Sequence, residues 1–491
     1  MKKISKRTAG ILMSVTSLPS RHGCGSFAGS AYGFVDFVSE AGFRLWQLLP
    51  LNPLGFGNSP YQPYSSMALD DIYLDLDVLI EEGLLKEVPD FNADAGRVDF
   101  KAVASFRLPY LKEAFKAAKE KGYNPAKFQK KNPWVKQWAY FMMNKRRFDC
   151  SWDAWPEEVR NWINGSQRIK PEDKEDIEFE IFLQDKLYEQ FWKLRNYAHE
   201  KGILLMGDLP FYSGFDSADV YCNQDQFRLH KINRRPTVVA GVPPDYFSPT
   251  GQRWGNPIYD WKAMRKDHYS YLIDRIAFSS RLYDLLRLDH FRAFDTYYVI
   301  PSYCPTAMIG HWVEAPGYRF FDTLFKEHPD IDIVAEDLGD LRPEVLELRD
   351  HYAFPGMNVI QFTFADEIWA HKDGYDEDNS VAYLGTHDNQ TIVGYIQNTL
   401  HEGAEDWRRA LVERGYRDDE PLNILLMRFC LNKKAILAVL SAQDILGLDD
   451  SARTNVPGEV SDANWTWRIA SLDGLREKLP MLQEMISGSG R

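Results

Sequence analysis

The sequence is poor in cysteine, contains no long apolar run and carries no excess of positive charge. Its five cysteines are widely spaced and form no C-x-x-C pair: Cys24, Cys150, Cys222, Cys304 and Cys430. This spacing argues against a disulfide framework and against a zinc site, and it predicts reduced thiols in a cytoplasmic protein. A run of about 18 apolar residues, the length needed to span a membrane, does not occur.

The charge balance narrows the range of partners. The formal net charge of the 491-residue chain is −13, which disfavours both nucleic acids and anionic membrane surfaces. We therefore expect no nucleic acid and no membrane as a partner, whereas a neutral small molecule or polymer is compatible with this charge. The N-terminal stretch MKKISKRTAGILMSV has only a brief apolar part and no convincing cleavage site, so we interpret it as part of a strand.

Short β-rich runs alternate with helical stretches, which is typical of strand–helix units in a parallel sheet. We count eight candidate strands, the number that forms a (β/α)8 TIM barrel. They span about 9–15, 44–50, 203–210, 285–291, 332–338, 358–364, 381–388 and 434–442. A doubly wound sheet is the structural alternative, but no glycine-rich phosphate turn follows the first strand.

Two long stretches interrupt this alternation. Residues 75–200 contain amphipathic helical patterns at 75–86, 102–121, 134–148 and 177–201, which predict a mainly helical insertion between the second and third strands. Residues 211–262 are rich in proline, glycine and aromatic residues, which predicts a loop-rich insertion over the active site. We expect residues 1–491 to form a single catalytic barrel with these helical and loop insertions.

Three of the predicted strands end on a carboxylate: Asp289 in LLRLDHF, Glu336 in DIVAEDLG and Asp388 in AYLGTHDN. Active sites of parallel barrels are built from side chains at the carboxyl ends of several strands. Three carboxylates at that end fit glycosidic-bond chemistry, which needs an acid, a nucleophile and often a stabilising group.

Each strand end also permits a structural interpretation. Arg287 and Asp289 share one face of their strand, where the guanidinium would keep the carboxylate ionised, as a nucleophile requires. The alternative is a surface ion pair. Glu336 follows a buried run, and burial near another carboxylate would raise its pKa as a general acid requires. The pair of Glu336 and Asp337 could instead cap a helix.

Further polar residues lie near other strand ends. His387 and Asp388 could bind vicinal sugar hydroxyls, with Asn389 beside them. Metal ligation is the competing interpretation, weakened by the lack of further histidines at ligand spacing. Asp208 could bind a sugar hydroxyl or act as a structural cap. Tyr61, in the loop GFGNSPYQPYSSMAL, would provide a stacking platform for a sugar or simply cover the core.

Taken together, these segments resemble the 4-α-glucanotransferases of glycoside hydrolase family 77, the amylomaltases or disproportionating enzymes. The resemblance covers nearly the whole chain, and the loop with RWGNP is specific to that family. The matching segments are SPYQ at 59–62, GDLPFY at 207–212, PPDYFSPTGQRWGNPIYDW at 243–261, RLDHFR at 287–292, AEDLG at 335–339, GTHDN at 385–389, QDILGL at 443–448, NVPG at 455–458 and NWTWR at 464–468. The stretch YSSMALDD after SPYQ departs from the family pattern.

The resemblance implies a retaining mechanism on a (β/α)8 barrel, with no cofactor and no metal. It implies that Asp289 is the nucleophile, Glu336 the general acid/base and Asp388 the stabiliser of the transition state. It also implies a set of residues that orient the substrate or stack on it: Tyr61, Asp208, Trp254, Arg287 and His387. We add Asn389 to this set.

The implied activity is the transfer of a segment of an α-1,4-glucan to the 4-hydroxyl of glucose or of another glucan. An α-amylase-type retaining hydrolase, which has the same three carboxylates and uses water as the acceptor, is the nearest alternative. A non-catalytic glucan-binding barrel and a metal-dependent isomerase are more remote. Transfer requires acceptor binding and water exclusion, and the loop 241–257 with Tyr246, Phe247 and Trp254 is our candidate for both. We expect maltooligosaccharides and α-1,4-glucans as partners, and a monomer or weak homo-oligomer.

Overall fold

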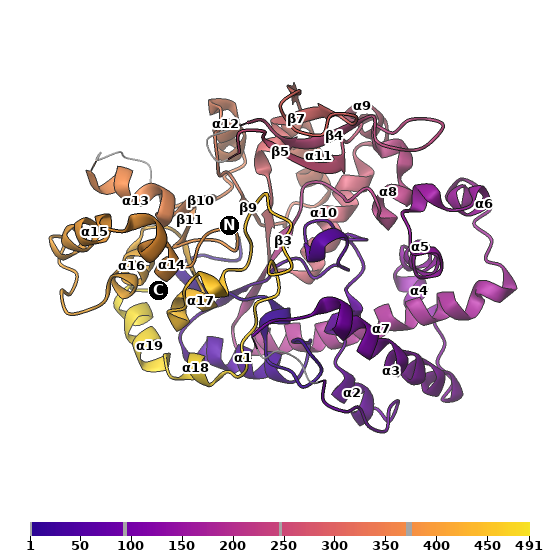
Figure 1. Ribbon diagram of the computed structural model, residues 1–491, viewed down its shortest axis with the longest axis horizontal. Coiled ribbons are helices and arrows are strands. Elements are labelled where there is room, and N and C mark those ends of the chain that lie inside the picture. The colour runs from indigo at the N-terminus through magenta and orange to yellow at the C-terminus, as the bar shows by residue number, and fades with distance from the viewer. Residues whose placement is uncertain (1, 92–95, 245–247, 370–375) are drawn as a thin grey trace.

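The chain is built around a closed parallel barrel, as its alternating pattern predicts. The computed structural model describes residues 2–91, 96–244, 248–369 and 376–491. Within these residues, eight parallel strands form one sheet in the order β10-β11-β12-β1-β2-β3-β6-β9 (Figure 1). The N–H of Ala335 in β9 donates to the carbonyl of Pro355, just before β10, at 2.9 Å and joins the two ends of the sheet. The (β/α)8 barrel is therefore confirmed.

Each predicted strand region overlaps one barrel strand. The strands are β1 (Thr8–Leu12), β2 (Leu45–Gln47), β3 (Leu204–Leu209), β6 (Leu285–Leu288), β9 (Ile333–Ala335), β10 (Gly356–Val359), β11 (Ser380–Tyr383) and β12 (Leu437–Ser441). The region 358–364 differs most, because β10 ends at Val359 and α13 (Ile360–Trp369) begins at the next residue. The apolar run NVIQFTF is compatible with both structures, so periodicity alone could not place this boundary.

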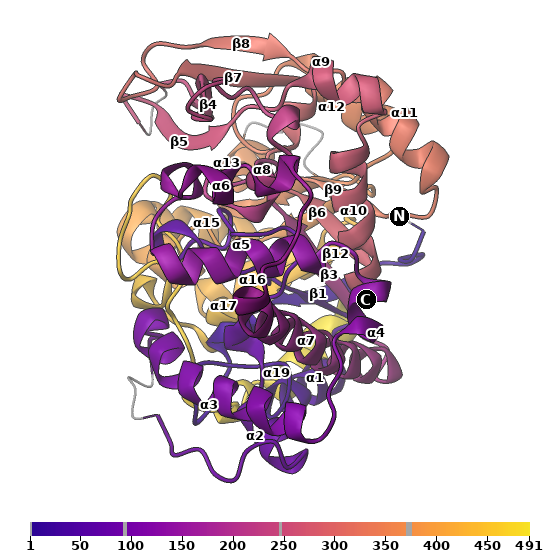
Figure 2. The same ribbon diagram turned by 90° about the vertical axis from the view of Figure 1, so that its right-hand side faces the viewer.

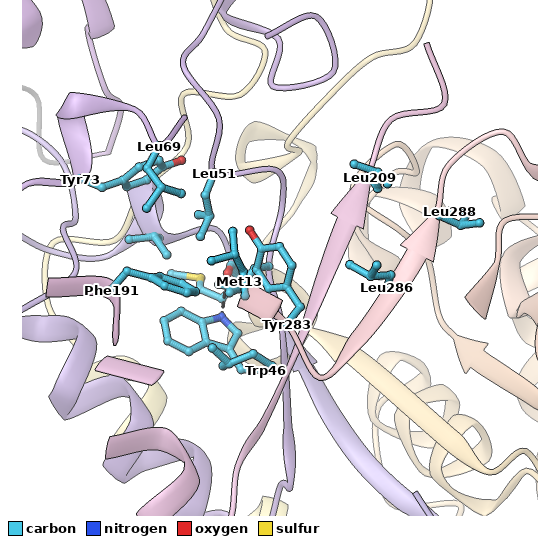
Figure 3. Close-up of a cluster of buried hydrophobic side chains, with 14 of the residues drawn as sticks. Met13, Trp46, Leu51, Leu69, Tyr73, Phe191, Leu209, Tyr283, Leu286 and Leu288 are labelled. Atoms are coloured by element: carbon cyan, nitrogen blue, oxygen red, sulfur yellow. Dashed lines mark hydrogen bonds between the residues drawn. The ribbon is translucent and has the colours of Figure 1, made fainter. Parts of the chain in front are cut away.

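Outer helices separate successive strands and pack their apolar sides against the barrel. They are α1 (Ser30–Glu40), α7 (Lys174–Glu200), α10 (Ser270–Leu282), α11 (Gly317–Glu327), α12 (Pro343–His351), α13, α16 (Leu422–Asn432) and α19 (Leu479–Gly488). Figure 3 shows part of the resulting core, where Trp46 of β2 lies near Phe191 of α7 and near Tyr283. The buried Trp46 indole N–H donates to the carbonyl of Met13 at 2.8 Å.

Alternation along the strands turns one set of side chains into the barrel. A mainly apolar cluster inside it contains a residue from each strand: Leu12, Leu45, Met206, Leu285, Val334, Val359, Val381 and Leu437. Two positions after Leu45, Met206, Leu285 and Val381, the side chains of Gln47, Asp208, Arg287 and Tyr383 share the inward face and are buried. The Tyr383 hydroxyl donates to Oε1 of Gln47 at 3.0 Å. These polar side chains lie toward the carboxyl ends of the strands.

The stretch 75–200 contains the predicted helices, and it holds the loop that follows β2. Its helices are α2 (Leu76–Glu81), α3 (Phe100–Glu120), α4 (Ala126–Lys131), α5 (Val135–Phe148), α6 (Glu157–Arg160) and α7. Helices α5 and α7 lie side by side (Figures 1 and 2). The buried side-chain amide of Gln184 in α7 makes two hydrogen bonds with the backbone of Leu69. It donates to the Leu69 carbonyl at 2.8 Å and accepts from the Leu69 N–H at 2.9 Å. The helical region thereby fixes the loop that carries Tyr61.

A four-stranded antiparallel sheet, in the order β5-β4-β7-β8, stands beside the barrel (Figure 2). Its strands are β4 (Val238–Val242), β5 (Gln252–Pro257), β7 (Thr296–Pro301) and β8 (His311–Glu314). Two of them lie in the stretch 211–262, which we expected to be loop. A Cβ on Gly241 would lie 2.1 Å from the carbonyl oxygen of Gln252, so glycine permits the close pairing there. Tyr246 and Phe247 lie outside the described residues.

The remaining described helices lie in the loops between the main elements. They are α8 (Ala218–Cys222), α9 (Trp261–Met264), α14 (Ile392–Tyr395), α15 (Gly403–Val412), α17 (Ala442–Leu446) and α18 (Asp473–Arg476). Within the part of the chain that the structure describes, none of the helices combines the length and the apolarity needed to cross a membrane.

Candidate active site

The ends of β3 and β6 place two carboxylates around one guanidinium. Nη1 of Arg287 donates to both carboxylate oxygens of Asp208 at 2.8 Å and to Oδ1 of Asp289 at 3.1 Å. Arg287 and Asp208 are buried, whereas 27% of the Asp289 side chain is exposed. The N–H of Asp289 donates to the carbonyl of Leu209 at 3.1 Å. Alternation along β6 predicts this contact between Arg287 and Asp289, and it leaves Asp289 open to a ligand.

The ionisation of Asp289 depends on opposing effects. Burial raises the pKa of Asp289 well above its usual value, Arg287 opposes this shift, and the neighbouring carboxylates Asp208, Glu336 and Asp388 add to it. We expected Arg287 to keep Asp289 ionised; its guanidinium does lower the pKa, but burial has the larger effect. Asp289 therefore becomes a carboxylate most readily when a neighbouring carboxyl group holds a proton.

Glu336, directly after β9, is the carboxyl group best placed to hold that proton. Burial raises the pKa of Glu336, and Arg287 and two backbone hydrogen bonds act against the shift. The N–H of His290 donates to Oε2 at 2.7 Å, and the N–H of Leu338 donates to Oε1 at 3.2 Å. His290 has a φ of 51°, and its left-handed conformation brings this N–H to Glu336. A protonated Glu336 beside an ionised Asp289 gives an acid and a nucleophile.

Tyr61 connects Asp208 to His387. Its hydroxyl donates to Oδ2 of Asp208 at 2.8 Å, and Nε2 of His387 lies 2.8 Å from the same hydroxyl. Because the single phenolic proton goes to the carboxylate, His387 donates from Nε2, which assigns its neutral tautomer. Burial lowers the pKa of His387, in agreement with a neutral ring. The two rings stack with centroids 5.2 Å apart, so Tyr61 orients His387.

Asp388 follows β11 and is held by a segment from the far end of the chain. Its side chain is 41% exposed, and Oδ2 lies 3.4 Å from Nε2 of His387. Nδ2 of Asn455 donates to Oδ1 of Asp388 at 2.6 Å. Arg453 donates to the backbone carbonyl of Asp388 at 2.7 Å. Residue-by-residue reasoning missed Asn455 and Arg453, because no local pattern links them to a strand end; the resemblance at NVPG was the one signal available.

Strand β5 brings Trp254 to the same region. The indole ring lies edge-on to the His290 ring, with centroids 4.9 Å apart. Nε2 of Gln62, in the loop that carries Tyr61, donates to the carbonyl of Trp254 at 3.1 Å. Nδ2 of Asn256 donates to the carbonyl of Ser213, in the loop after β3, at 3.1 Å. Two barrel loops therefore hold β5 in place, and Gln62 was not among the predicted site residues.

Asn389 is engaged within its own turn. Its Oδ1 accepts hydrogen bonds from the backbone N–H and the hydroxyl of Thr386, at 2.8 and 2.9 Å. These bonds hold the turn that carries His387 and Asp388. A direct contact between Asn389 and a substrate stays a prediction.

Trp465 is a further aromatic residue that sequence reasoning did not single out. Its ring centroid lies 5.5 Å from that of Tyr61 and 5.7 Å from that of His387. Its φ of 70° is uncommon for a residue with a side chain, and such backbone strain clusters at functional sites. Trp465 closes one side of the Tyr61–His387 pair.

The arrangement suits chemistry at the anomeric carbon of a sugar. It contains a carboxyl group with a raised pKa, a second carboxylate beside a guanidinium, and a third carboxylate next to a neutral histidine. Among the described residues, no group of three or more His, Cys, Asp or Glu side chains is arranged to hold a metal ion. Fold and site together define a barrel enzyme that acts on glycosidic bonds.

Comparison with known proteins identifies the family. Residues 13–473 match the model of glycoside hydrolase family 77, described as 4-alpha-glucanotransferase. The chain belongs to this family and is an enzyme with 4-α-glucanotransferase activity. The family that the sequence motifs predict is therefore confirmed.

Relatives match over nearly their whole length. The chain is 38% identical over 481 residues to a 4-alpha-glucanotransferase of Streptococcus pneumoniae, covering 95% of this chain and 94% of the relative. It is 39% identical over 478 residues to one of Thermus thermophilus, covering 94% and 95%. The amylomaltase from Streptococcus agalactiae in complex with acarbose has a TM-score of 0.92 at 32% identity, covering 99% of this chain and 100% of that one.

Proposed function

We propose that the enzyme transfers α-1,4-glucan segments by double displacement, with Asp289 as nucleophile and Glu336 as acid/base. In the first step Glu336 gives its proton to the glycosidic oxygen, the bond to the anomeric carbon breaks, and a carboxylate oxygen of Asp289 forms an ester to that carbon. In the second step Glu336 takes the proton of an acceptor 4-hydroxyl, whose oxygen displaces Asp289. The two inversions retain the α configuration.

One observation carries this assignment: a single guanidinium donates to both Asp208 and Asp289, while the hydrogen bonds that Glu336 accepts from the described residues all come from backbone N–H groups. The cation favours the ionised form of the nucleophile more directly than that of the acid. Burial raises the pKa of Glu336, which favours the protonated form that a general acid requires. This distribution of charge supports an acid and a nucleophile in these two positions.

His387 and Asp388 would bind sugar hydroxyls beside the reacting carbon. When a sugar binds, the Nε2–H of a neutral His387 would be shared between the Tyr61 hydroxyl and a sugar hydroxyl, and Asp388 would accept through Oδ2, which lies 3.4 Å from Nε2. Vicinal hydroxyls offer one acceptor and one donor to such a pair. As positive charge develops on the sugar ring, Asp388 would stabilise it. Tyr61 and Asp208 would hold His387, and Asn389 would hold the turn.

Acceptor selectivity separates transfer from the hydrolysis carried out by an α-amylase-type enzyme. Trp254 is fixed beside His290 by hydrogen bonds from two barrel loops to β5. We expect this ring to stack on the acceptor sugar and to limit the access of water to the glucosyl ester. Maltooligosaccharides and longer α-1,4-glucans would serve as donors and acceptors.

Incubation of the pure protein with maltotriose alone tests transfer. Chromatography should show glucose together with a ladder of longer maltooligosaccharides. Release of glucose and maltose without longer products would make the enzyme a hydrolase, and the acceptor role of Trp254 would then be wrong.

The variant Asp289→Asn tests the nucleophile. It should retain less than about 1% of the wild-type rate with maltotriose, because the amide cannot form the ester. Asp295→Asn, a change of the same kind at a carboxylate that pairs with Arg342 and not with the residues of the site, is the matched control. Retention of more than a few per cent of turnover by Asp289→Asn would refute the assignment.

We also propose a cellular location, a domain organisation and an oligomeric state for the enzyme. We propose a cytoplasmic enzyme, since all five cysteines are free thiols. We propose that residues 1–491 form one catalytic unit, with 75–200 and 211–262 as insertions, and that the protein is a monomer or a weak homo-oligomer.

A further inference from the structure

We infer that Asn455 is a positioning residue that fixes the orientation of the Asp388 carboxylate. The inference rests on the proposed role of Asp388 as a ligand for sugar hydroxyls. Asn455 lies 67 positions after Asp388 in the chain, yet its Nδ2 donates to Oδ1 at 2.6 Å. The amide is oriented by this partner, because its own carbonyl oxygen would repel the carboxylate in the reverse orientation.

This hydrogen bond gives the two carboxylate oxygens of Asp388 different partners. Oδ1 is engaged by Asn455, whereas Oδ2 is turned toward Nε2 of His387 at 3.4 Å. With 41% of its side chain exposed, Asp388 would otherwise be free to rotate and present its oxygens to solvent. Asn455 thus holds Oδ2 where a hydroxyl can bridge it to His387.

The segment that carries Asn455 is itself anchored on the site. Arg453 donates from Nε to the carbonyl of Asn455 and from Nη2 to the carbonyl of Asp388, both at 2.7 Å. One guanidinium therefore ties the backbones of both partners together. The N–H of Trp465 donates to the carbonyl of Thr454 at 2.7 Å, and the Trp465 ring packs beside Tyr61. The segment 453–465 therefore supports the side of the site on which Asp388 and His387 would bind sugar hydroxyls.

Two variants of Asn455 separate positioning from general structural support. Asn455→Ala removes the donor and should lower kcat/KM for maltotriose about 10- to 100-fold at every pH, mainly through kcat. Asn455→Asp places two carboxylates side by side, and such a pair binds one proton more tightly than a lone carboxylate does. Once that proton is bound, the carboxyl O–H replaces the amide N–H as donor. The deficit of Asn455→Asp relative to wild type should therefore shrink as the pH falls from about 7 to about 5.

Among the described residues, the charged and titratable groups that interact with Asp388 include His387, Tyr61, Arg453 and Asp289. All of them are present in both variants, so the ratio of variant to wild type isolates position 455. Asn464 is the matched control, because it holds the same segment through the backbone of Val456 and Glu459. Asn464→Asp should lower the melting temperature without a pH-dependent change in the activity ratio.

Several outcomes would overturn the inference. It fails if Asn455→Ala has wild-type kcat, or if the ratio for Asn455→Asp does not change with pH, or if Asn464→Asp shows the same pH dependence. If Asn455→Asp does not fold, the loss in kcat for Asn455→Ala, with KM nearly unchanged, decides the question. Asp388→Asn distinguishes failure of this inference from failure of the proposed function. A wild-type kcat in that variant would refute the proposed role of Asp388 itself.

Discussion

At the scale of single residues, the site is organised by the number of charges that one cation can stabilise. Arg287 binds Asp208 and Asp289 directly, and it acts on Glu336 only across a greater distance. Burial raises the pKa of both Asp289 and Glu336, so the two groups compete for one proton. The guanidinium resolves this competition by favouring the ionised form of the group that it touches.

The pH dependence of the enzyme should report Glu336. A general acid must be protonated, so kcat/KM should fall as the pH rises through the pKa of Glu336, and its raised pKa extends activity to higher pH. The variant Glu336→Gln, supplied with an α-glucosyl fluoride whose leaving group needs no proton, should release a burst of fluoride at a rate that lacks this alkaline limb. The measurement is the pH profile of the burst. An alkaline limb that persists in Glu336→Gln would assign it to another group.

At the scale of elements, the site is assembled from barrel loops and one strand of the small sheet. Gln62 comes from the loop after β2, and Trp254 comes from β5, yet a hydrogen bond of 3.1 Å connects them. Asn256 connects the same strand to the loop after β3. Because these contacts fix β5 to the barrel, the fold sets the distance between Trp254 and the three carboxylates of the site.

Loss of the Gln62 contact should shift the balance from transfer to hydrolysis. Gln62→Ala removes one partly buried hydrogen bond and loosens β5, and we expect the ratio of hydrolysis to transfer to rise roughly 5-fold. Hydrolysis is measured as the net gain in reducing ends, which transfer leaves constant, and transfer as the longer products formed from maltotriose. Gln224→Ala is the control, since Gln224 also donates to a backbone carbonyl, that of Tyr221, but outside the site. An equal rise in both variants would contradict the role given to Gln62.

The sequence predicts elements with local signals better than it predicts contacts between distant segments. The barrel strands have such signals because they are short apolar runs that alternate with helical patterns, and the three carboxylates have them because each follows one of these runs. Strands β4 and β5 were missed because they contain glycine and proline, and because β7, the second partner of β4, follows only after β6. Asn455 was missed for the same reason: its partner is 67 positions away, and no local spacing predicts that contact.

At the scale of the whole molecule, the N-terminal segment closes the end of the barrel opposite the site. The backbone N–H groups of Lys2 and Lys3 donate to the carboxylate of Asp332, just before β9, at 2.7–2.8 Å. Ile4 is 4% exposed and belongs to the mainly apolar cluster inside the barrel. Stability and catalysis are thus assigned to opposite ends of the barrel, as in other barrel enzymes.

Ile4→Ala should therefore weaken the fold and leave the chemistry intact. We expect the free energy of unfolding to fall by about 2–5 kcal/mol, because a buried side chain is replaced by a cavity. Urea titration followed by tryptophan fluorescence measures this change, and kcat with maltotriose should stay at the wild-type value. Ile232→Ala is the control, since Ile232 is 84% exposed and should change stability by less than about 0.5 kcal/mol. A loss of kcat in Ile4→Ala at full stability would contradict the separation of the two ends.

The identity of the residue that carries the sugar tests the central claim most directly. Glu336→Gln with an α-glucosyl fluoride should complete the first step and stall before the second, because no base activates the acceptor. Digestion and mass spectrometry should then find one glucosyl group on the peptide that contains Asp289, and none in the double variant with Asp289→Asn. A glucosyl group on Asp208 or Asp388, or continued turnover without any labelled peptide, would contradict the mechanism.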